Sequence, residues 1–296
     1  MGSLKFELIR RALSRKPTIN VTAICRLAGV SRSGYYYHLL AFPLKTAKDE
    51  VSLNQISEIF ERRRKRAGID SIDMDLRAKG IVINRKKIAR IKRQNRLYAI
   101  IRKKNPYKDI PLKSGEHKMV PNLLRREFYT PIPDSIYSTD MTYLYYGNCE
   151  KAYLSATKDL CTNEVVSSNL MRTPTVDSFV REFERLLGKL PVEQKKELII
   201  HSDQGFQYTH PSFQELLKKE GVKQSMSRQG NCLDNAPIES FFGHLKDILE
   251  LKNCKTFEDV RVEVERSIKY YNVERPQKAL NKKLPAEYRG LICGFL

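Results

Sequence analysis

Residues 227–246 read SRQGNCLDNAPIESFFGHLK, and the interpretation of the whole chain starts from them. The stretch runs from a glycine-marked turn into a predicted helix that covers about residues 233–251. Glu239 is the single acid on an otherwise uncharged face of that helix. An isolated acid of this kind indicates a functional carboxylate with partners elsewhere in the chain.

Two upstream segments each offer one such partner. Residues 197–203 (ELIIHSD) form an apolar run that ends in Asp203, and residues 136–146 (IYSTDMTYLYY) form a β-branched and aromatic run with Asp140 at its centre. Both runs are typical of strands. If these two strands are neighbours, about 5 Å apart, their acids meet at one end of a sheet. Three carboxylates there can hold two divalent cations that clamp the attacking and leaving oxygens of a phosphodiester.

The excess positive charge lies in the first part of the chain. Residues 1–127 contain 31 Lys and Arg against 11 Asp and Glu, whereas residues 128–296 contain 23 of each. Such asymmetry predicts a polyanion-binding region joined to a neutral domain with another task.

Composition also excludes several classes of protein. With 41% hydrophobic residues the chain is globular, and no apolar run approaches the length of a membrane span. The N-terminal residues lack the features of a secretory signal, which predicts a cytoplasmic protein. The six cysteines and five histidines show no zinc spacing, so we expect reduced thiols and no zinc domain.

Residues 1–45 are predicted to form a helix-turn-helix. Gly29 supplies the turn, Ser31 caps the second helix, and Tyr35 packs back on the first. Arg32, at the start of the second helix, would face DNA. A plain helical hairpin would use the same apolar positions.

Residues 46–104 are predicted to form a second, basic helix-turn-helix with apolar stripes that include Ile56, Ile59 and Ile88, and with a strand-like segment at 81–83. Asn84 caps a helix that is rich in cations and has no acid. We predict that this helix lies against DNA phosphates through a set of basic side chains: Arg85, Lys86, Lys87, Arg90 and Arg93.

Residues 105–127 are rich in Pro and Lys without periodicity, which predicts a linker. Residues 128–285 read as three strands followed by alternating helices and strands, the order of a mixed sheet with helices on both faces. Residues 286–296 form a tail that packs on this core.

The motifs STDMTY, HSDQGFQY, GNCLDNAPIESFFGHLK and YYNVERPQKALNKKLPAEY, in this order, resemble bacterial insertion-sequence transposases of the IS-three type, which are retroviral-integrase-like enzymes with a ribonuclease-H-like core. The resemblance covers nearly the whole chain. It implies an α/β fold with a ribonuclease-H-like mixed sheet. It also implies that Asp140, Asp203 and Glu239 are catalytic residues and ligands of two Mg²⁺ ions, with Mn²⁺ as a substitute.

Two further residues lie on the Glu239 face of the predicted helix. Lys246, two turns later, would reach the phosphate or base next to the reacting bond. Asn235, one turn earlier, would hydrogen-bond the substrate or a metal-bound water, or only satisfy the start of the helix. By contrast, Asp159 is predicted to lie at a turn and Asp234 to act as a helix cap.

The resemblance implies a DNA transposase that cleaves the ends of an insertion sequence and joins them to target DNA, as a homo-oligomer at the bacterial nucleoid. A product of an upstream reading frame is a further expected partner, because the family's active enzyme is commonly a fusion. One departure is Tyr137, where the family usually has Trp. Two alternatives remain open: a metal-dependent nuclease of the same fold and a catalytically inert DNA-binding regulator.

Overall fold

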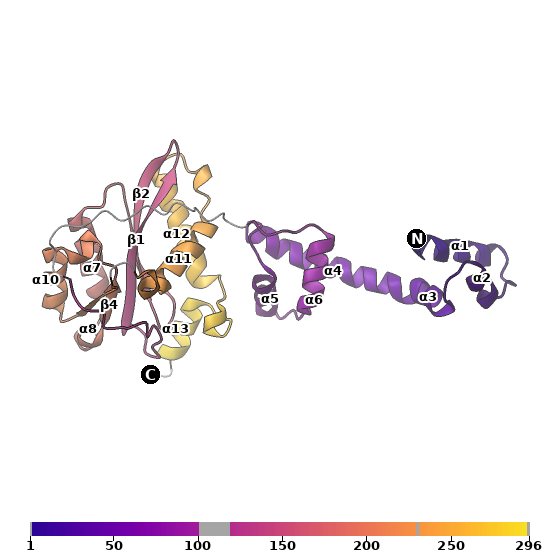
Figure 1. The fold of residues 1–296 in the computed structure, drawn as a ribbon, viewed down its shortest axis with the longest axis horizontal. Coiled ribbons are helices and arrows are strands. Elements are labelled where there is room, and N and C mark those ends of the chain that lie inside the picture. The colour runs from indigo at the N-terminus through magenta and orange to yellow at the C-terminus, as the bar shows by residue number, and fades with distance from the viewer. Residues whose placement is uncertain (1, 101–118, 229–230, 295–296) are drawn as a thin grey trace. The chain divides into compact units, whose positions relative to one another are not determined.

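The computed structural model describes residues 2–100, 119–228 and 231–294, and the chain divides into two compact units, 1–100 and 101–296 (Figure 1). The first unit begins with the helices α1 (Gly2–Arg15), α2 (Val21–Leu27) and α3 (Arg32–Tyr36). Their small core contains Ile9, Cys25 and Tyr35.

The predicted turn of the first helix-turn-helix is present in the structure. Gly29 has a φ of 65°, a left-handed conformation that glycine adopts without strain. The Ser31 side chain accepts a hydrogen bond of 3.0 Å from the Gly34 N–H and so caps α3. Tyr35 is buried against α1 and α2, as the pattern predicts.

Three longer helices complete the first unit: α4 (Phe42–Arg62), α5 (Ile69–Ala78) and α6 (Arg85–Gln94). A π-turn over Tyr37–Ala41 leads from α3 into α4, so the boundary that we predicted after residue 45 falls inside a helix. The expected strand at 81–83 does not form, because those residues have no ladder partner in the described part of the chain. The core of these helices contains the predicted apolar side chains Ile56, Ile59 and Ile88, together with Phe60, Leu76 and Ile91.

The second unit contains a five-stranded mixed sheet in the order β3-β2-β1-β4-β5. The strands are β1 (Ile136–Tyr146), β2 (Glu150–Asp159), β3 (Val165–Met171), β4 (Ile199–Ser202) and β5 (Lys223–Met226). The first three are antiparallel, whereas β4 and β5 run parallel to β1. This is the ribonuclease-H-like arrangement that the sequence predicts, with the first and fourth strands side by side.

Helices cover both faces of the sheet (Figure 1). On one face α7 (Val176–Leu187) and α10 (Pro211–Glu220) bury an apolar core, and on the other α11 (Ala236–Ile248) and α12 (Phe257–Val273) bury a second one. Two short helices were not predicted, α8 (Val192–Glu197) and α9 (Phe206–Thr209). Each has fewer than seven residues, too few to show a helical period.

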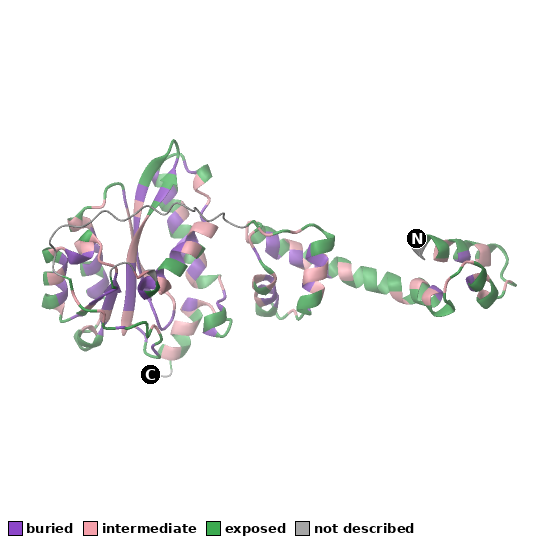
Figure 2. Ribbon diagram, viewed as in Figure 1, coloured by how far each residue is buried: buried purple, intermediate pink, exposed green. Residues whose placement is uncertain are grey.

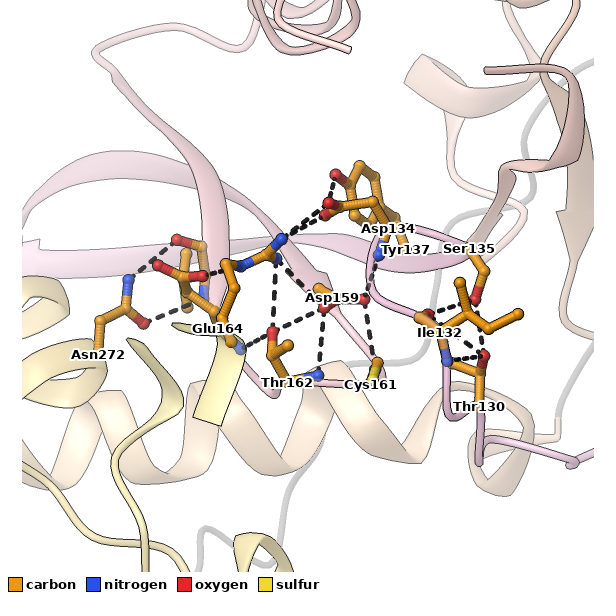
Figure 3. A network of polar contacts seen from close by, with 12 residues as sticks. Thr130, Ile132, Asp134, Ser135, Tyr137, Asp159, Cys161, Thr162, Glu164 and Asn272 are labelled. Carbon is orange, nitrogen blue, oxygen red and sulfur yellow. Dashed lines mark hydrogen bonds and ion pairs between the residues drawn. The ribbon is translucent and has the colours of Figure 1, made fainter. Parts of the chain in front are cut away.

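The predicted tail is the helix α13 (Pro285–Cys293), which Arg289 anchors to the second unit. Figure 3 shows the acidic side chains that it contacts, Asp134, Asp159 and Glu164. Arg289 Nη1 donates to Asp134 at 2.8 and 2.9 Å, Nη2 donates to Asp159 at 3.2 Å, and Nε pairs with Glu164. Asp159 also accepts from the Thr162 hydroxyl at 2.6 Å. Asp159 is therefore a structural acid, and it is the last residue of β2, directly before the turn in which it was predicted to lie.

Residues 101–118 lie outside the described residues, and they include most of the predicted linker, residues 105–118. The segment 119–127 belongs to the second unit. Leu124 is buried, the Leu123 N–H donates to Ser225 Oγ at 2.9 Å, and Arg126 forms an ion pair with Asp234 at 2.8 Å. These nine residues are therefore part of the folded second unit and do not belong to a linker.

Candidate active site

Asp140 and Asp203 occupy matching positions along neighbouring strands. The parallel ladder places Ser138 of β1 opposite His201 of β4, and each acid lies two residues further along its own strand direction. Adjacent strands are about 4.8 Å apart, so the two carboxylates emerge beside each other where β4 ends. Both side chains are half-buried.

Backbone amides hold these two carboxylates. Asp140 Oδ1 accepts from the Met141 N–H at 2.7 Å, and Asp203 Oδ1 accepts from the Gly205 N–H at 2.9 Å. A Cβ at residue 205 would lie 2.9 Å from Asp203 Oδ1, so any residue larger than glycine there would displace this carboxylate oxygen. The motif that follows Asp203 therefore has a steric role in placing the acid.

Burial and mutual repulsion raise the pKa of Asp140 well above its usual range. Loss of hydration contributes most, the charge of Asp203 comes next, and Glu239 adds to it, while Lys246 opposes the shift. Burial likewise raises the pKa of Asp203. Asp203 and Glu239 are therefore both within electrostatic reach of Asp140.

Glu239 lies in the first turn of α11 and is exposed. The charge of Glu239 raises the pKa of Asp140, which is consistent with a position near that acid. The three carboxylates do not form a complete set of metal ligands in this structure. Within residues 2–100, 119–228 and 231–294 no three His, Cys, Asp or Glu side chains are grouped so that they could hold a metal ion.

A buried network centred on Asp234 fixes the start of α11. The Asp234 carboxylate is fully buried and accepts from Arg126 Nε and Arg228 Nε, each at 2.8 Å. It also accepts from Asn122 Nδ2 at 3.1 Å. Asp234 was predicted to cap the helix, and in the structure it is the centre of a buried network of hydrogen bonds. The hydrogen bond from Arg228 contributes most to the lowered pKa of Asp234.

His201 connects the network around Asp234 to the strand of Asp203. Its ring is fully buried, with Nε2 2.9 Å from the Asp234 carbonyl oxygen and Nδ1 2.8 Å from Ser225 Oγ. A carbonyl only accepts, so Nε2 carries the proton and Nδ1 accepts from the Ser225 hydroxyl. Burial lowers the pKa of His201, which keeps the ring neutral. His201 was not among the predicted site residues, although a histidine two positions before Asp203 on an apolar strand is a signal that could have indicated it.

The structure places Lys246 against β1. Its Nζ donates to Thr142 Oγ1 at 2.6 Å and lies 5.6 Å from the centre of the Tyr143 ring. Lys246 therefore reaches the strand of Asp140 from α11, two turns after Glu239.

Asn235 precedes α11 and is buried. Its Oδ1 has no hydrogen-bond partner among the described residues. This arrangement leaves both predicted roles of Asn235 open.

The predicted DNA-contacting cations of the first unit differ in their surroundings. Arg85 pairs with Asp70, and Lys87 and Arg90 both pair with Asp49 of α4 at 3.1 and 2.9 Å. Lys86 and Arg93 are exposed on α6, and Arg32 is exposed at the start of α3 with its guanidinium 5.7 Å from the Tyr36 ring centre. Internal ion pairs thus engage three of these six cations.

The chemistry of the strand acids fits a hard divalent cation. Carboxylate oxygens are the preferred donors for Mg²⁺, and two adjacent carboxylates with raised pKa values lose their repulsion when a cation lies between them. Asp140 and Asp203 therefore suit a divalent ion as a pair, and Glu239 is the adjacent acid that would complete the set.

Family models match segments of both units of the chain. A family model described as "Integrase core domain" matches residues 130–232, and a second model with the same description matches 220–285. A model described as "HTH-like domain" matches residues 46–105.

Curated relatives cover most of the chain. The putative transposase for insertion sequence element IS150 of Escherichia coli is 36% identical over 267 residues, which cover 90% of this chain and 92% of that protein. An uncharacterised 31 kDa protein of insertion element IS600 from Shigella sonnei is 30% identical and covers 90% of this chain and 97% of its own. Among solved structures, the HTLV-2 integrase catalytic core domain in complex with magnesium aligns with a TM-score of 0.41 and 19% identity over 53% of this chain and 97% of that one.

Proposed function

This chain belongs to the insertion-sequence transposases that carry an integrase core, and on that premise we propose that it cleaves DNA at the ends of an insertion sequence and joins them to target DNA. The observation that carries the proposal is the matched placement of Asp140 and Asp203 on parallel strands beside the helix of Glu239. Membership of this family supports a polynucleotidyl transferase activity. We assign that reaction to the side chains of the candidate active site.

We assign to Asp140, Asp203 and Glu239 the binding of two Mg²⁺ ions, with Mn²⁺ as a substitute. When bound, such ions supply the charge that stabilises the attacking and leaving oxygens of an in-line phosphoryl transfer. Water first attacks a phosphodiester at the element end and releases a 3′-hydroxyl. That hydroxyl then attacks a phosphodiester of the target strand and displaces its 3′-oxygen, so no covalent protein intermediate is needed.

The other residues of the site hold its geometry. His201 and Asp234 fix the start of α11, which sets the direction of Glu239 relative to the strand acids. Lys246 places a positive charge next to β1, where it can orient a phosphate or base beside the reacting bond. A site built from such preorganised charges needs little reorganisation as the reaction proceeds.

The helical unit provides the contacts with duplex DNA in this proposal. Phosphate contacts by exposed cations such as Lys86, Arg93 and Arg32 give affinity and position without reading sequence. The reaction joins two DNA molecules, so we propose that the protein acts as a homo-oligomer on DNA at the bacterial nucleoid. The product of an upstream reading frame is a further proposed partner. No helix among the described residues is long and apolar enough to cross a membrane.

The test is a joining reaction with the full chain. Purified protein is incubated with duplexes that carry candidate insertion-sequence ends, a labelled target plasmid and Mg²⁺, and the products are resolved for new covalent joints. We expect cleaved ends and joined strands, both lost on chelation with EDTA.

Two other results would point to the alternatives. Cleaved ends without any joined product would indicate a metal-dependent nuclease. Specific DNA binding without cleavage under any divalent cation would indicate an inert regulator.

A further inference from the structure

The outer half of the β1–β2 hairpin carries an aromatic surface near the candidate active site. The surface lies on the face of the sheet that α7 and α10 cover. Along β1, Met141 is the last side chain on this face that packs in the core under these helices. Beyond it, Tyr143 and Tyr145 are 43% and 49% exposed. The far end of the hairpin, at the top of the view in Figure 2, has the colour of exposed residues. Because β4 pairs with β1 only over residues 136–138, the sheet does not continue beside these tyrosines in the described ladders.

A lysine on the partner strand completes this surface. Lys151 lies opposite Tyr145 in the antiparallel register, and its Nζ is 5.5 Å from the Tyr145 ring centre and 5.8 Å from that of Tyr143. The two rings meet edge to face, with centres 5.4 Å apart and an interplanar angle of 74°. We call Tyr143, Tyr145 and Lys151 the hairpin platform.

The charge on this face favours a polyanion. Opposite residues of an antiparallel pair share a face, so the platform shares its face with Met141, Tyr153 and Ser155, and none of these six side chains is a carboxylate. Glu150, at the end of the hairpin, lies opposite Tyr146 and therefore belongs to the other face. Lysines beside exposed aromatic rings are typical of surfaces that bind nucleic acid strands.

The hairpin platform and the candidate active site lie on opposite faces of β1, next to the edge of β1 that β4 leaves unpaired in the described ladders. Side chains alternate along a strand, so Asp140 and Thr142 belong to the α11 face and Tyr143 to the opposite one. Lys246 connects the two faces, since its Nζ donates to Thr142 and lies 5.6 Å from the Tyr143 ring centre. Strands rise about 3.4 Å per residue, so Tyr145 lies roughly 17 Å along β1 from Asp140. A DNA strand that leaves Asp140 over this edge would therefore reach the platform within a few nucleotides.

We propose that the hairpin platform binds unpaired bases of the DNA strand whose phosphodiester lies at Asp140, an inference that rests on the proposed function. Tyr145 offers a ring on which a base can stack, and Lys151 holds the adjoining phosphate. Stacking requires a base that has left the duplex, so the platform favours frayed or single-stranded ends over blunt ones. It is insensitive to sequence, because every base has a stacking face.

The test compares two DNA probes in the absence of divalent cations: a blunt duplex and the same duplex with a short single-stranded thymidine extension. The proteins are the full chain and its Tyr145→Ala, Tyr145→Phe and Lys151→Ala variants, with melting temperatures measured on each preparation. We expect Tyr145→Ala to weaken binding of the extended probe about tenfold and to leave the blunt probe unchanged. Tyr145→Phe keeps the ring and should keep the affinity.

Lys151→Ala should weaken binding of the extended probe and reduce its salt dependence by about one unit of slope. Equal affinities of the full chain and Tyr145→Ala for the extended probe would overturn the proposal. So would an equal loss for Tyr145→Phe and Tyr145→Ala, or a change of oligomeric state in place of a change in DNA affinity.

Failure of the platform is distinguishable from failure of the proposed function. If the platform alone is wrong, Tyr145→Ala still joins strands at the rate of the full chain. If the proposed function is wrong, the unsubstituted protein joins none.

Discussion

The helical unit and the candidate active site surround their acids differently. In residues 1–100, Asp75 is buried between Arg62 and Arg63, with contacts of 2.9 and 2.6 Å. Asp140 and Asp203 are held by backbone N–H groups instead. A shielded carboxylate with a cation beside it stabilises the fold, whereas a pair of carboxylates held by amides is suited to an added cation.

The contrast also exists within the second unit. Asp234 lies shortly before Glu239 in the sequence, but it is fully buried and bound by Arg126 and Arg228. It therefore belongs with Asp75 rather than with the strand acids.

The largest effect is expected for neutral substitutions of the three candidate ligands. Asp203→Asn and Glu239→Gln keep size and position but remove an anionic oxygen. We expect each to reduce cleavage and joining at least about 100-fold, since even residues that only support a metal ligand cost up to that factor. The measurement is the rate of joined product in Mg²⁺, with DNA affinity determined on the same preparation.

Stability provides the control for these variants. The pKa of Asp140 is raised in the folded protein, so the stability that its protonated form contributes is lost as pH rises through that pKa. In EDTA at alkaline pH, Asp140→Asn should therefore melt at or above the temperature of the unsubstituted protein. A variant that melts lower yet still joins strands would show that these acids are structural.

The same substitution at Asp234 should have the opposite outcome. Asp234→Asn leaves Arg126 and Arg228 without their counter-charge, and we expect a loss of about 3 kcal/mol in the free energy of unfolding. The pKa of Asp234 is lowered, so its contribution is present at neutral pH and is lost as pH falls below its unfolded value toward the folded one. Urea unfolding at neutral and acidic pH measures both. A penalty that stays constant with pH would contradict the ion-pair assignment.

Glu182 is a buried acid with a raised pKa outside the candidate site. It lies in α7, accepts from Ser167 Oγ at 3.1 Å, and burial raises its pKa to about 7. The stability contributed by its protonated form is lost as pH rises through that value. Glu182→Gln should therefore raise stability by roughly 2 kcal/mol at alkaline pH and by little or nothing near pH 4. Equal effects at both pH values would contradict the raised pKa.

Lys246→Ala should lower the joining rate about tenfold, which corresponds to about 1.4 kcal/mol, the size of one charge-assisted hydrogen bond. Total DNA affinity should change less, because many other cations contribute to it. Lys246→Arg keeps the charge and should retain part of the activity. A rate equal to that of the unsubstituted protein would show that Lys246 serves the fold through contacts such as that with Thr142.

The smallest effect is expected for single cations of α6. Lys86 is exposed, whereas Arg90 is paired with Asp49. Lys86→Gln should weaken duplex binding a few-fold and reduce the salt slope by about one unit, while Arg90→Gln should mainly lower the melting temperature. If both variants lose the same slope, the pairing of Arg90 does not decide its availability to DNA.

The strands and helices of the second unit, and the positions of Asp140 and Asp203 along two of its strands, could be predicted because their signals are local. Strands β1 to β5 and helices α7, α10 and α11 are marked by apolar period and by turn residues, and Gly29, Ser31 and Asn84 act as their chemistry predicts. The expected strand at 81–83 failed because three β-branched residues form a strand only when a partner strand is available. The short helices α8 and α9 were below the length at which a period can be recognised.

Long-range polar contacts were not predictable in the same way. The pairing of Arg289 with Asp134, and that of Arg126 with Asp234, join residues more than 100 positions apart, and no spacing in one sequence encodes such partners. For the same reason, the cationic helix α6 looked uniformly available to DNA, although Asp49 of a different helix engages two of its cations.

The segment 119–127 has a practical consequence for exchanging parts between relatives. A chimaera joined at residue 128, where the sequence suggests that the catalytic domain begins, would keep all three candidate ligands but replace Leu123 and Arg126. Arg126 holds Asp234, and the Leu123 N–H donates to Ser225, the hydroxyl that contacts the ring of His201. Such a hybrid would carry Glu239 on a helix whose start has lost part of its support and retains the contacts with Arg228 and His201, so a junction upstream of residue 119 is the one that keeps all of these contacts.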